Sequence, residues 1–202
     1  MKKLLVIVTS LLALTASQAL AKTEGSSVGL SVFKAEQTTR SSLNVTNSFK
    51  DNNIGFGLNY KYAIPVAYDF YVAPGVSYDR IGTKAHNTVT TTGSDRVDVN
   101  NRYSVRADVG YDVNDTLAVY GVIGYSALGA EVSNYRGSLT EKNNTHRNFA
   151  ALYGLGAKTA ISKDFDLTFE LTTQRANLQT ASSAEKSKTQ LNTYGVGLAY
   201  NF

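Results

Sequence analysis

The chain has 202 residues, and its 20 basic and 16 acidic side chains give a formal net charge of +4 at pH 7. This length predicts one domain, and a charge so close to balance, with no basic run, excludes a nucleic-acid-binding surface. Cysteine is absent, so the chain has neither a disulfide framework nor cysteine ligands for a metal.

The first residues have the organisation of a secretory signal peptide. Lys2 and Lys3 precede the apolar stretch LLVIVTSLLAL, and the triplet ending at Ala21 is a small-x-small cleavage site. The apolar stretch is too short to span a membrane comfortably as a helix. We therefore predict that residues 1–21 are a cleaved signal peptide and that residues 22–202 form the mature domain.

Eight segments of the mature chain alternate apolar residues with small or polar ones, the period-two pattern of β-strands. In chain order these segments are 27–34, 53–63, 70–79, 102–113, 117–127, 151–161, 166–174 and 193–202. The second, NIGFGLNYKYA, shows the pattern most clearly. Most segments are close to the 9–11 residues of a tilted membrane strand.

The connections between these segments alternate between long and short. The long ones are 35–52, 80–100, 128–147 and 175–190, and the short ones are 64–69, 114–116 and 162–165. In an up-and-down meander, every long loop then lies at one end and every short turn at the other. Transmembrane barrels of the outer membrane have this asymmetry.

Alternation alone does not decide which face of the strands points inward, and a soluble lipocalin-like barrel is the competing interpretation. The polar face consists mainly of Gly, Ala, Ser, Thr and Asn, which suit a crowded lumen better than a solvated exterior. The apolar face carries no charge, as lipid requires, and many of its tyrosines lie towards strand ends. We therefore predict an all-β fold, an eight-stranded antiparallel up-and-down transmembrane β-barrel.

With these marks the chain resembles the small eight-stranded outer-membrane β-barrel family of Gram-negative bacteria. This family includes opacity-type adhesins, attachment-and-invasion barrels and the membrane domain of outer membrane protein A. The resemblance implies a monomer in the cell outer membrane, surrounded by outer-membrane lipid and lipopolysaccharide. It also implies a structural or surface protein whose four long extracellular loops contact host or cell-surface ligands in adhesion. A narrow porin-like channel and a lipid A-modifying enzyme are the alternatives.

Charged residues of both signs face the lumen by strand parity. They are Lys61, Asp79, Arg106, Asp108, Lys158 and Glu170, together with the neutral Gln174. Buried ions require partners, so we predict an internal polar network that plugs the barrel. A gated ion path is the alternative, although an eight-stranded lumen usually lacks the room for one.

Catalytic and metal-binding patterns are weak in this sequence. The two histidines, His86 and His146, fall in predicted long loops, and the His-x-Ser pattern of barrel deacylases is absent. There is no His-x-x-x-His pair, no Asp-rich calcium loop and no phosphate-binding glycine loop. We expect no enzyme activity, cofactor or metal. The predicted long loops also carry both signs of charge, with acidic Asp95, Glu131, Glu141 and Glu185 among the basic residues. These charges either hydrate an exposed surface or bind anionic lipopolysaccharide headgroups or host glycans. The basic residues are Lys84, Arg96, Arg136, Lys142, Arg147, Lys186 and Lys188.

The chain ends on a strand pattern, TYGVGLAYNF. Its apolar residues are Tyr194, Val196, Leu198, Tyr200 and Phe202, which we predict to face lipid. A final strand must pair with the first to close a barrel, because an open edge is excluded in hydrocarbon. In the family that the chain resembles, a terminal aromatic of this kind is similar to the signal read by the outer-membrane assembly machinery.

Overall fold

The computed structural model describes residues 24–40, 48–89, 93–136, 139–142, 146–179 and 186–202. These residues form nine β-strands: β1 (Gly25–Arg40), β2 (Ser48–Ala67), β3 (Phe70–Val89), β4 (Gly93–Asp112), β5 (Leu117–Arg136), β6 (Leu139–Lys142), β7 (His146–Ala160), β8 (Phe165–Gln179) and β9 (Lys186–Asn201). No helix in these ranges has the length and apolarity to cross a membrane.

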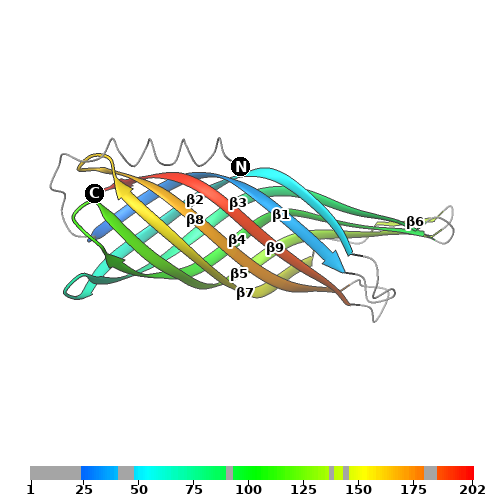
Figure 1. Ribbon diagram of the computed structural model, residues 1–202. Helices are drawn as coiled ribbons and strands as arrows, with labels where there is room; N and C mark the ends of the chain where they lie inside the picture. The colour runs from blue at the N-terminus through cyan, green and yellow to red at the C-terminus, as the bar shows by residue number, and fades with distance from the viewer. Residues whose placement is uncertain (1–23, 41–47, 90–92, 137–138, 143–145, 180–185) are drawn as a thin grey trace.

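Eight of the strands close into a single antiparallel barrel, as predicted. The strand order is β4-β3-β2-β1-β9-β8-β7-β5, and an additional β4–β5 pairing closes the sheet. The last strand pairs with the first: Leu198 lies opposite Leu30, which lies opposite Leu58 on its other side. Strand β6 pairs with the far end of β5 and extends the barrel at one end (Figure 1).

The short turns all lie at the other end, and their side chains fix them. In the β4–β5 turn, Asn114 Oδ1 accepts the backbone N–H groups of Thr116 and Leu117, each at 2.9 Å. In the β7–β8 turn, Ser162 Oγ accepts the N–H of Phe165 at 3.1 Å. Such Asx and Ser turns tie a side chain to the backbone a few residues ahead, so tight reversals need no long loop.

The strands are longer than the sequence pattern predicted. Strand β3 continues from the predicted end at Asp79 to Val89, and β4 begins at Gly93 instead of Arg102. Much of each predicted long loop is therefore strand. In the added residues, charged side chains such as Lys84 face outward, and the interior holds apolar side chains together with a few neutral polar ones. The prediction missed these residues because it required an apolar outer face for a membrane strand.

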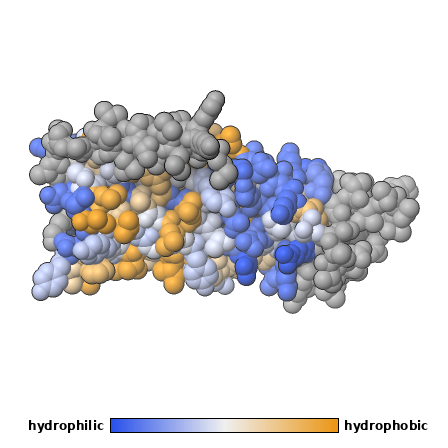
Figure 2. All heavy atoms as spheres, viewed as in Figure 1, coloured by the Kyte–Doolittle hydropathy of each residue, from blue (hydrophilic) through white to orange (hydrophobic). Residues whose placement is uncertain are grey.

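The barrel accordingly has two halves of opposite polarity. In the half with the short turns, the outer face is apolar: Leu30, Phe56 and Leu155 are each more than 60% exposed. In the other half, apolar residues fill the interior, with Ile81, Val99, Leu128 and Leu191 almost completely buried. Figure 2 shows the same division, with orange side chains over one half and blue ones over the other. We call the apolar outer band the belt and the polar-surfaced half the extension.

Candidate functional site

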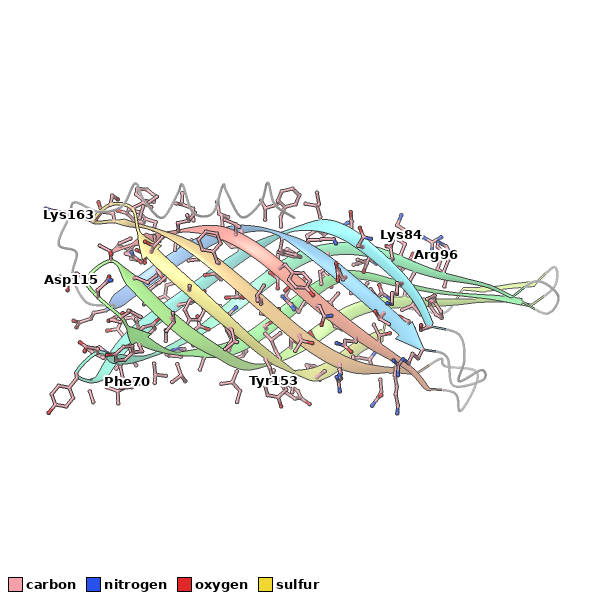
Figure 3. All side chains as sticks on the ribbon, in the orientation of Figure 1. Phe70, Lys84, Arg96, Asp115, Tyr153 and Lys163 are labelled. Atoms are coloured by element: carbon pink, nitrogen blue, oxygen red, sulfur yellow. The ribbon has the colours of Figure 1, made fainter. Side chains whose placement is uncertain are left out.

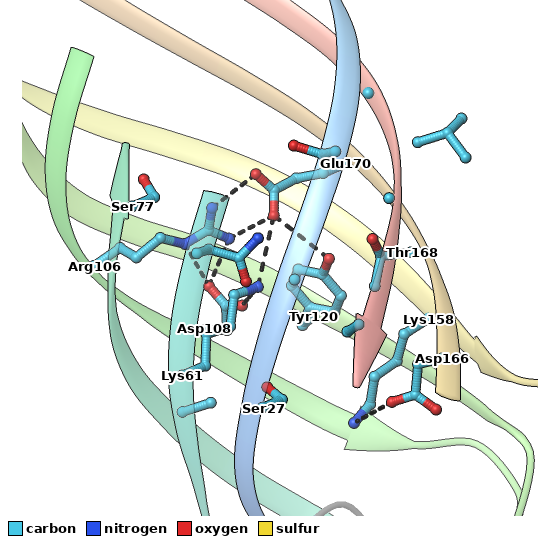
Figure 4. Close-up of a pocket in the computed structure, with 18 of the residues that line it drawn as sticks. Ser27, Lys61, Ser77, Arg106, Asp108, Tyr120, Lys158, Asp166, Thr168 and Glu170 are labelled. Carbon is cyan, nitrogen blue, oxygen red and sulfur yellow. Dashed lines mark hydrogen bonds and ion pairs between the residues drawn. The ribbon is translucent and has the colours of Figure 1, made fainter. Parts of the chain in front are cut away.

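The lumen of the belt half contains a compact cluster of four charged residues centred on Arg106 of β4 (Figure 4). Its guanidinium forms a fork with Glu170 of β8, in which Nη1 lies 2.7 Å from Oε1 and Nη2 lies 2.5 Å from Oε2. Arg106 Nη2 also lies 2.7 Å from Asp108 Oδ1, and Lys61 Nζ donates to the other oxygen of Asp108 at 2.5 Å. Two positive and two negative charges therefore balance inside the barrel.

Glycines make room for this cluster. Arg106 lies between Gly75 and Gly124 across the neighbouring strands, and Glu170 lies between Gly156 and Gly195. A β-carbon built on Gly124 would come within 2.9 Å of the Arg106 side chain. The small residues on the lumen face therefore have a physical role. A narrow barrel has room for long ionic side chains only where the positions beside them carry no side chain.

Two tyrosines pack into the same lumen. Tyr71 lies opposite Gly110, and Tyr120 lies opposite Gly156, so that each ring covers a glycine. The Lys61 ammonium lies 5.2 Å from the centre of the Tyr120 ring, within the range of a cation–π contact. These rings fill space that glycine leaves open.

A second ionic layer lies nearer the extension. Arg102 Nε donates to Asp79 Oδ2 at 2.8 Å, and both side chains are less than 10% exposed. Arg102 Nη1 also reaches Thr172 Oγ1 at 3.2 Å, and Thr172 shares a 2.6 Å hydrogen bond with Thr193. This layer joins four strands across the lumen.

The third ionic contact lies at the short-turn mouth. Lys158 Nζ is 3.8 Å from Asp166 Oδ2 and 5.1 Å from the centre of the Tyr71 ring. The structure thus places all six charged residues singled out in the sequence inside the lumen, in three separate layers. Sequence analysis missed Arg102, Asp166 and the two tyrosines, although Arg102 and Asp166 share the parity of Arg106 and Glu170 on their strands.

Two cavities lined by described residues lie in the short-turn half of the lumen. A cavity of about 80 Å³ lies beside the ionic cluster, and another of about 240 Å³ lies at the short-turn mouth, with Lys158 and Asp166 in the walls of both. Towards the extension, the buried apolar side chains, Phe33 among them, fill the barrel. Among them, Gln37 accepts from Thr83 Oγ1 at 2.7 Å and donates to Thr39 Oγ1 at 3.0 Å. Within the described residues, the lumen is therefore a vestibule at the short-turn end, followed by a packed interior.

The C-terminal residues singled out in the sequence lie on the outer face of β9 and at the residue after it. Their exposed fractions run from 43% to 66%: Tyr194, Val196, Leu198, Tyr200 and Phe202. The rings of Tyr200 and Phe202 are 5.5 Å apart, and Tyr200 also contacts Phe165. The terminus is held by the Phe202 N–H, which donates to the Ser26 carbonyl at 3.0 Å. Their role as an assembly signal stays a prediction.

The histidines and basic residues expected in loops lie on strands instead. His86 is exposed on the outer face of β3, opposite Arg96, and His146 is the first residue of β7. The described residues contain no group of three His, Cys, Asp or Glu side chains arranged to hold a metal. The prediction that these residues lie in loops was wrong, because the strands of the extension were interpreted as loops.

Comparisons with known proteins agree with this architecture. The sequence profile described as "Outer membrane protein beta-barrel domain" matches residues 6–202. Among solved structures, OprG of Pseudomonas aeruginosa aligns with a TM-score of 0.56 at 10% identity, covering 90% of this chain and 98% of OprG. Ail of Yersinia pestis aligns at 0.51 with 17% identity, covering 89% and 100%. A comparison with curated protein sequences gives no match. At these identities the structural likeness shows the fold.

Proposed function

The chain belongs to the outer membrane protein beta-barrel domain family of the bacterial outer membrane, and on this basis we propose that it is a structural surface protein that acts in adhesion. The adhesive parts are the connections between strands at the far end of the extension, which we call the tips. In such barrels the short turns face the periplasm and the long connections face outward. The extension then lies outside the membrane. The polar outer surface of the extension supports this placement.

The observation that carries the proposal is the apolar core inside the extension. Beyond the belt, β3 runs from Arg80 to Val89, a rise of roughly 20 Å at a strand spacing of about 3.3 Å per residue and a tilt of about 40°. Ile81, Val99 and Leu128 are buried there, and each contributes about 1.5–3 kcal/mol relative to exposure. A barrel whose interior is filled and whose strands are hydrogen-bonded is a rigid scaffold. Connecting segments held on a rigid scaffold are suited to binding.

A narrow channel is the second candidate, and the vestibule at the periplasmic mouth is what favours it. Conduction needs a continuous water column, however, and the apolar core of the extension interrupts it. Planar-bilayer recording on the purified protein separates the two functions. Display predicts no stable single-channel steps, and reproducible steps would favour the channel.

The display proposal is tested by exchanging the tips. Residues 41–47 and 180–185, which connect β1 to β2 and β8 to β9, are each replaced by a short Gly-Ser linker. We expect bacteria carrying this variant to lose adhesion to host cells while surface levels stay normal. The matched control replaces the periplasmic turn 113–116 with a two-residue Asn-Gly turn and should adhere like the parent. Unchanged adhesion of the tip variant would contradict the proposal.

A further inference from the structure

Two lysine ammonium groups in the lumen each lie beside a carboxylate and over a tyrosine ring, and the deeper of the two is fully bound. Lys61 Nζ lies 2.5 Å from Asp108 Oδ2 and 5.2 Å from the centre of the Tyr120 ring. The Tyr120 hydroxyl in turn donates to Glu170 Oε2 at 3.4 Å. We call these residues the inner ammonium site. A ring face and a carboxylate are the two groups that attract an ammonium ion most strongly.

The second lysine lies in a similar but looser site, formed by Lys158, Tyr71 and Asp166, which we call the outer ammonium site. Lys158 Nζ lies 5.1 Å from the centre of the Tyr71 ring and 3.8 Å from Asp166 Oδ2, which is too far for a hydrogen bond. Tyr71 is 3% exposed and Asp166 is 7% exposed. Among the described residues, neither the Asp166 carboxylate nor the Tyr71 hydroxyl forms a hydrogen bond. Since buried polar groups normally have partners, these two groups indicate a ligand that donates hydrogen bonds.

The outer ammonium site lies in the walls of the two lumen cavities. Tyr71 lines the cavity of about 80 Å³, and Lys158 and Asp166 line both this cavity and the one of about 240 Å³. Figure 4 shows Lys158 and Asp166 together, and Figure 3 shows Asp115 and Lys163 at the short-turn end. The wall of the larger cavity carries more carboxylates than ammonium groups: Glu24, Asp69, Asp112, Asp115 and Asp166 against Lys158 and Lys163. A recess lined mainly by negative charge concentrates cations.

We propose that the outer ammonium site binds an aliphatic diammonium ligand in competition with Lys158. One ammonium group of the ligand donates hydrogen bonds to the Asp166 carboxylate and the Tyr71 hydroxyl oxygen, and the other lies among the carboxylates of the mouth. Lys158 yields its place beside Asp166 because the contact between them is long. The described residues contain no set of three side chains arranged to hold a metal ion, which favours an ammonium ion over a metal. The inference does not depend on adhesion.

The test measures binding of diaminobutane to the purified barrel in detergent micelles by isothermal titration calorimetry. Asp166→Asn removes the carboxylate charge and should weaken binding about tenfold. Lys158→Met removes the competing ammonium group and should strengthen binding about threefold. The matched control is Asp164→Asn, which removes an exposed carboxylate that lies in the neighbouring turn and outside both cavity walls. Because its charge is screened by water, this control should change affinity less than about twofold.

The opposite effects expected at Asp166 and Lys158 distinguish competition at one site from a general loss of stability. The proposal would be overturned by a parent that does not bind diaminobutane, by an Asp166→Asn barrel that binds like the parent, or by weaker binding to Lys158→Met. Butanediol has the same carbon chain without charge and should not compete. Competition by butanediol would overturn the assignment to an ammonium ligand.

A second variant covers the case in which Asp166→Asn misfolds, shown by loss of heat-modifiable gel mobility. Lys158→Met with Asp166→Met removes the whole ion pair, a change that buried pairs often tolerate, and should bind diaminobutane about tenfold more weakly than the parent. Parent-like binding to this double variant would equally overturn the proposal. The tip variant above should bind diaminobutane normally, so that loss of adhesion and loss of ammonium binding remain separable.

Discussion

The charged cluster around Arg106 gives the most quantitative prediction about this barrel. The change is Arg106→Met, which keeps an unbranched side chain of similar length and removes the guanidinium. It leaves Glu170 and Asp108 with only Lys61 between them, 2.5 Å from Asp108 and 3.9 Å from Glu170. Removing one partner of a buried ion pair costs about 3–5 kcal/mol. Because the Glu170 side chain is 24% exposed to the vestibule, we expect about 2–3 kcal/mol.

The assay is urea unfolding of the barrel in detergent micelles or lipid vesicles. The folded fraction is read from heat-modifiable gel mobility, since the chain has no tryptophan for fluorescence. The matched control is Arg106→Met with Glu170→Met, which removes one charge of each sign and retains the pair between Lys61 and Asp108. Apolar replacement of a whole buried pair is often neutral, so this variant should unfold within about 1 kcal/mol of the parent. An Arg106→Met barrel as stable as the parent would refute the view that the cluster depends on charge balance.

Three further changes probe other parts of the structure. Gly156→Val places a side chain against the Tyr120 ring and should destabilise the barrel by about 1–3 kcal/mol in the same urea assay; an unchanged midpoint would contradict the packing described. Leu128→Ala opens a cavity in the extension and should cost about 2–5 kcal/mol, against little for the lipid-facing Leu155→Ala. Deleting Phe202 should lower the amount of barrel in the outer membrane more than its synthesis, measured by fractionation, and normal membrane levels would count against the assembly role.

The belt half could be predicted from the sequence because its physics is simple. Lipid outside and a narrow lumen inside require apolar residues to alternate strictly with small or polar ones, as at Ile54, Phe56 and Leu58 of β2. The prediction of a closed barrel follows from the even number of strands and from the exclusion of open sheet edges in lipid. The same parity placed Arg106 and Glu170 in the lumen. Which charges pair could not be predicted, since that depends on the stagger between strands that are distant in sequence.

The extension could not be predicted because two signals change there. Apolar side chains turn inward, so β3 and β4 beyond the belt no longer look like membrane strands. In addition, an irregularity between Val99 and Asn101 shifts the register with β5. Val97 and Val99 therefore face inward at odd positions, whereas Arg102 faces inward at an even one. A period-two pattern cannot be followed through a bulge.

The placement of the extension outside the cell is the central claim, and cysteine labelling on intact bacteria tests it most directly. The chain has no cysteine, so single substitutions report cleanly. Figure 3 marks the three positions: Lys84 on the extension, Tyr153 in the belt and Asp115 in a short turn. A membrane-impermeant maleimide should label Lys84→Cys and leave Tyr153→Cys and Asp115→Cys unlabelled until the cells are lysed, and Asp115→Cys should then react. Labelling of Asp115→Cys on intact cells, or protection of Lys84→Cys, would contradict the account.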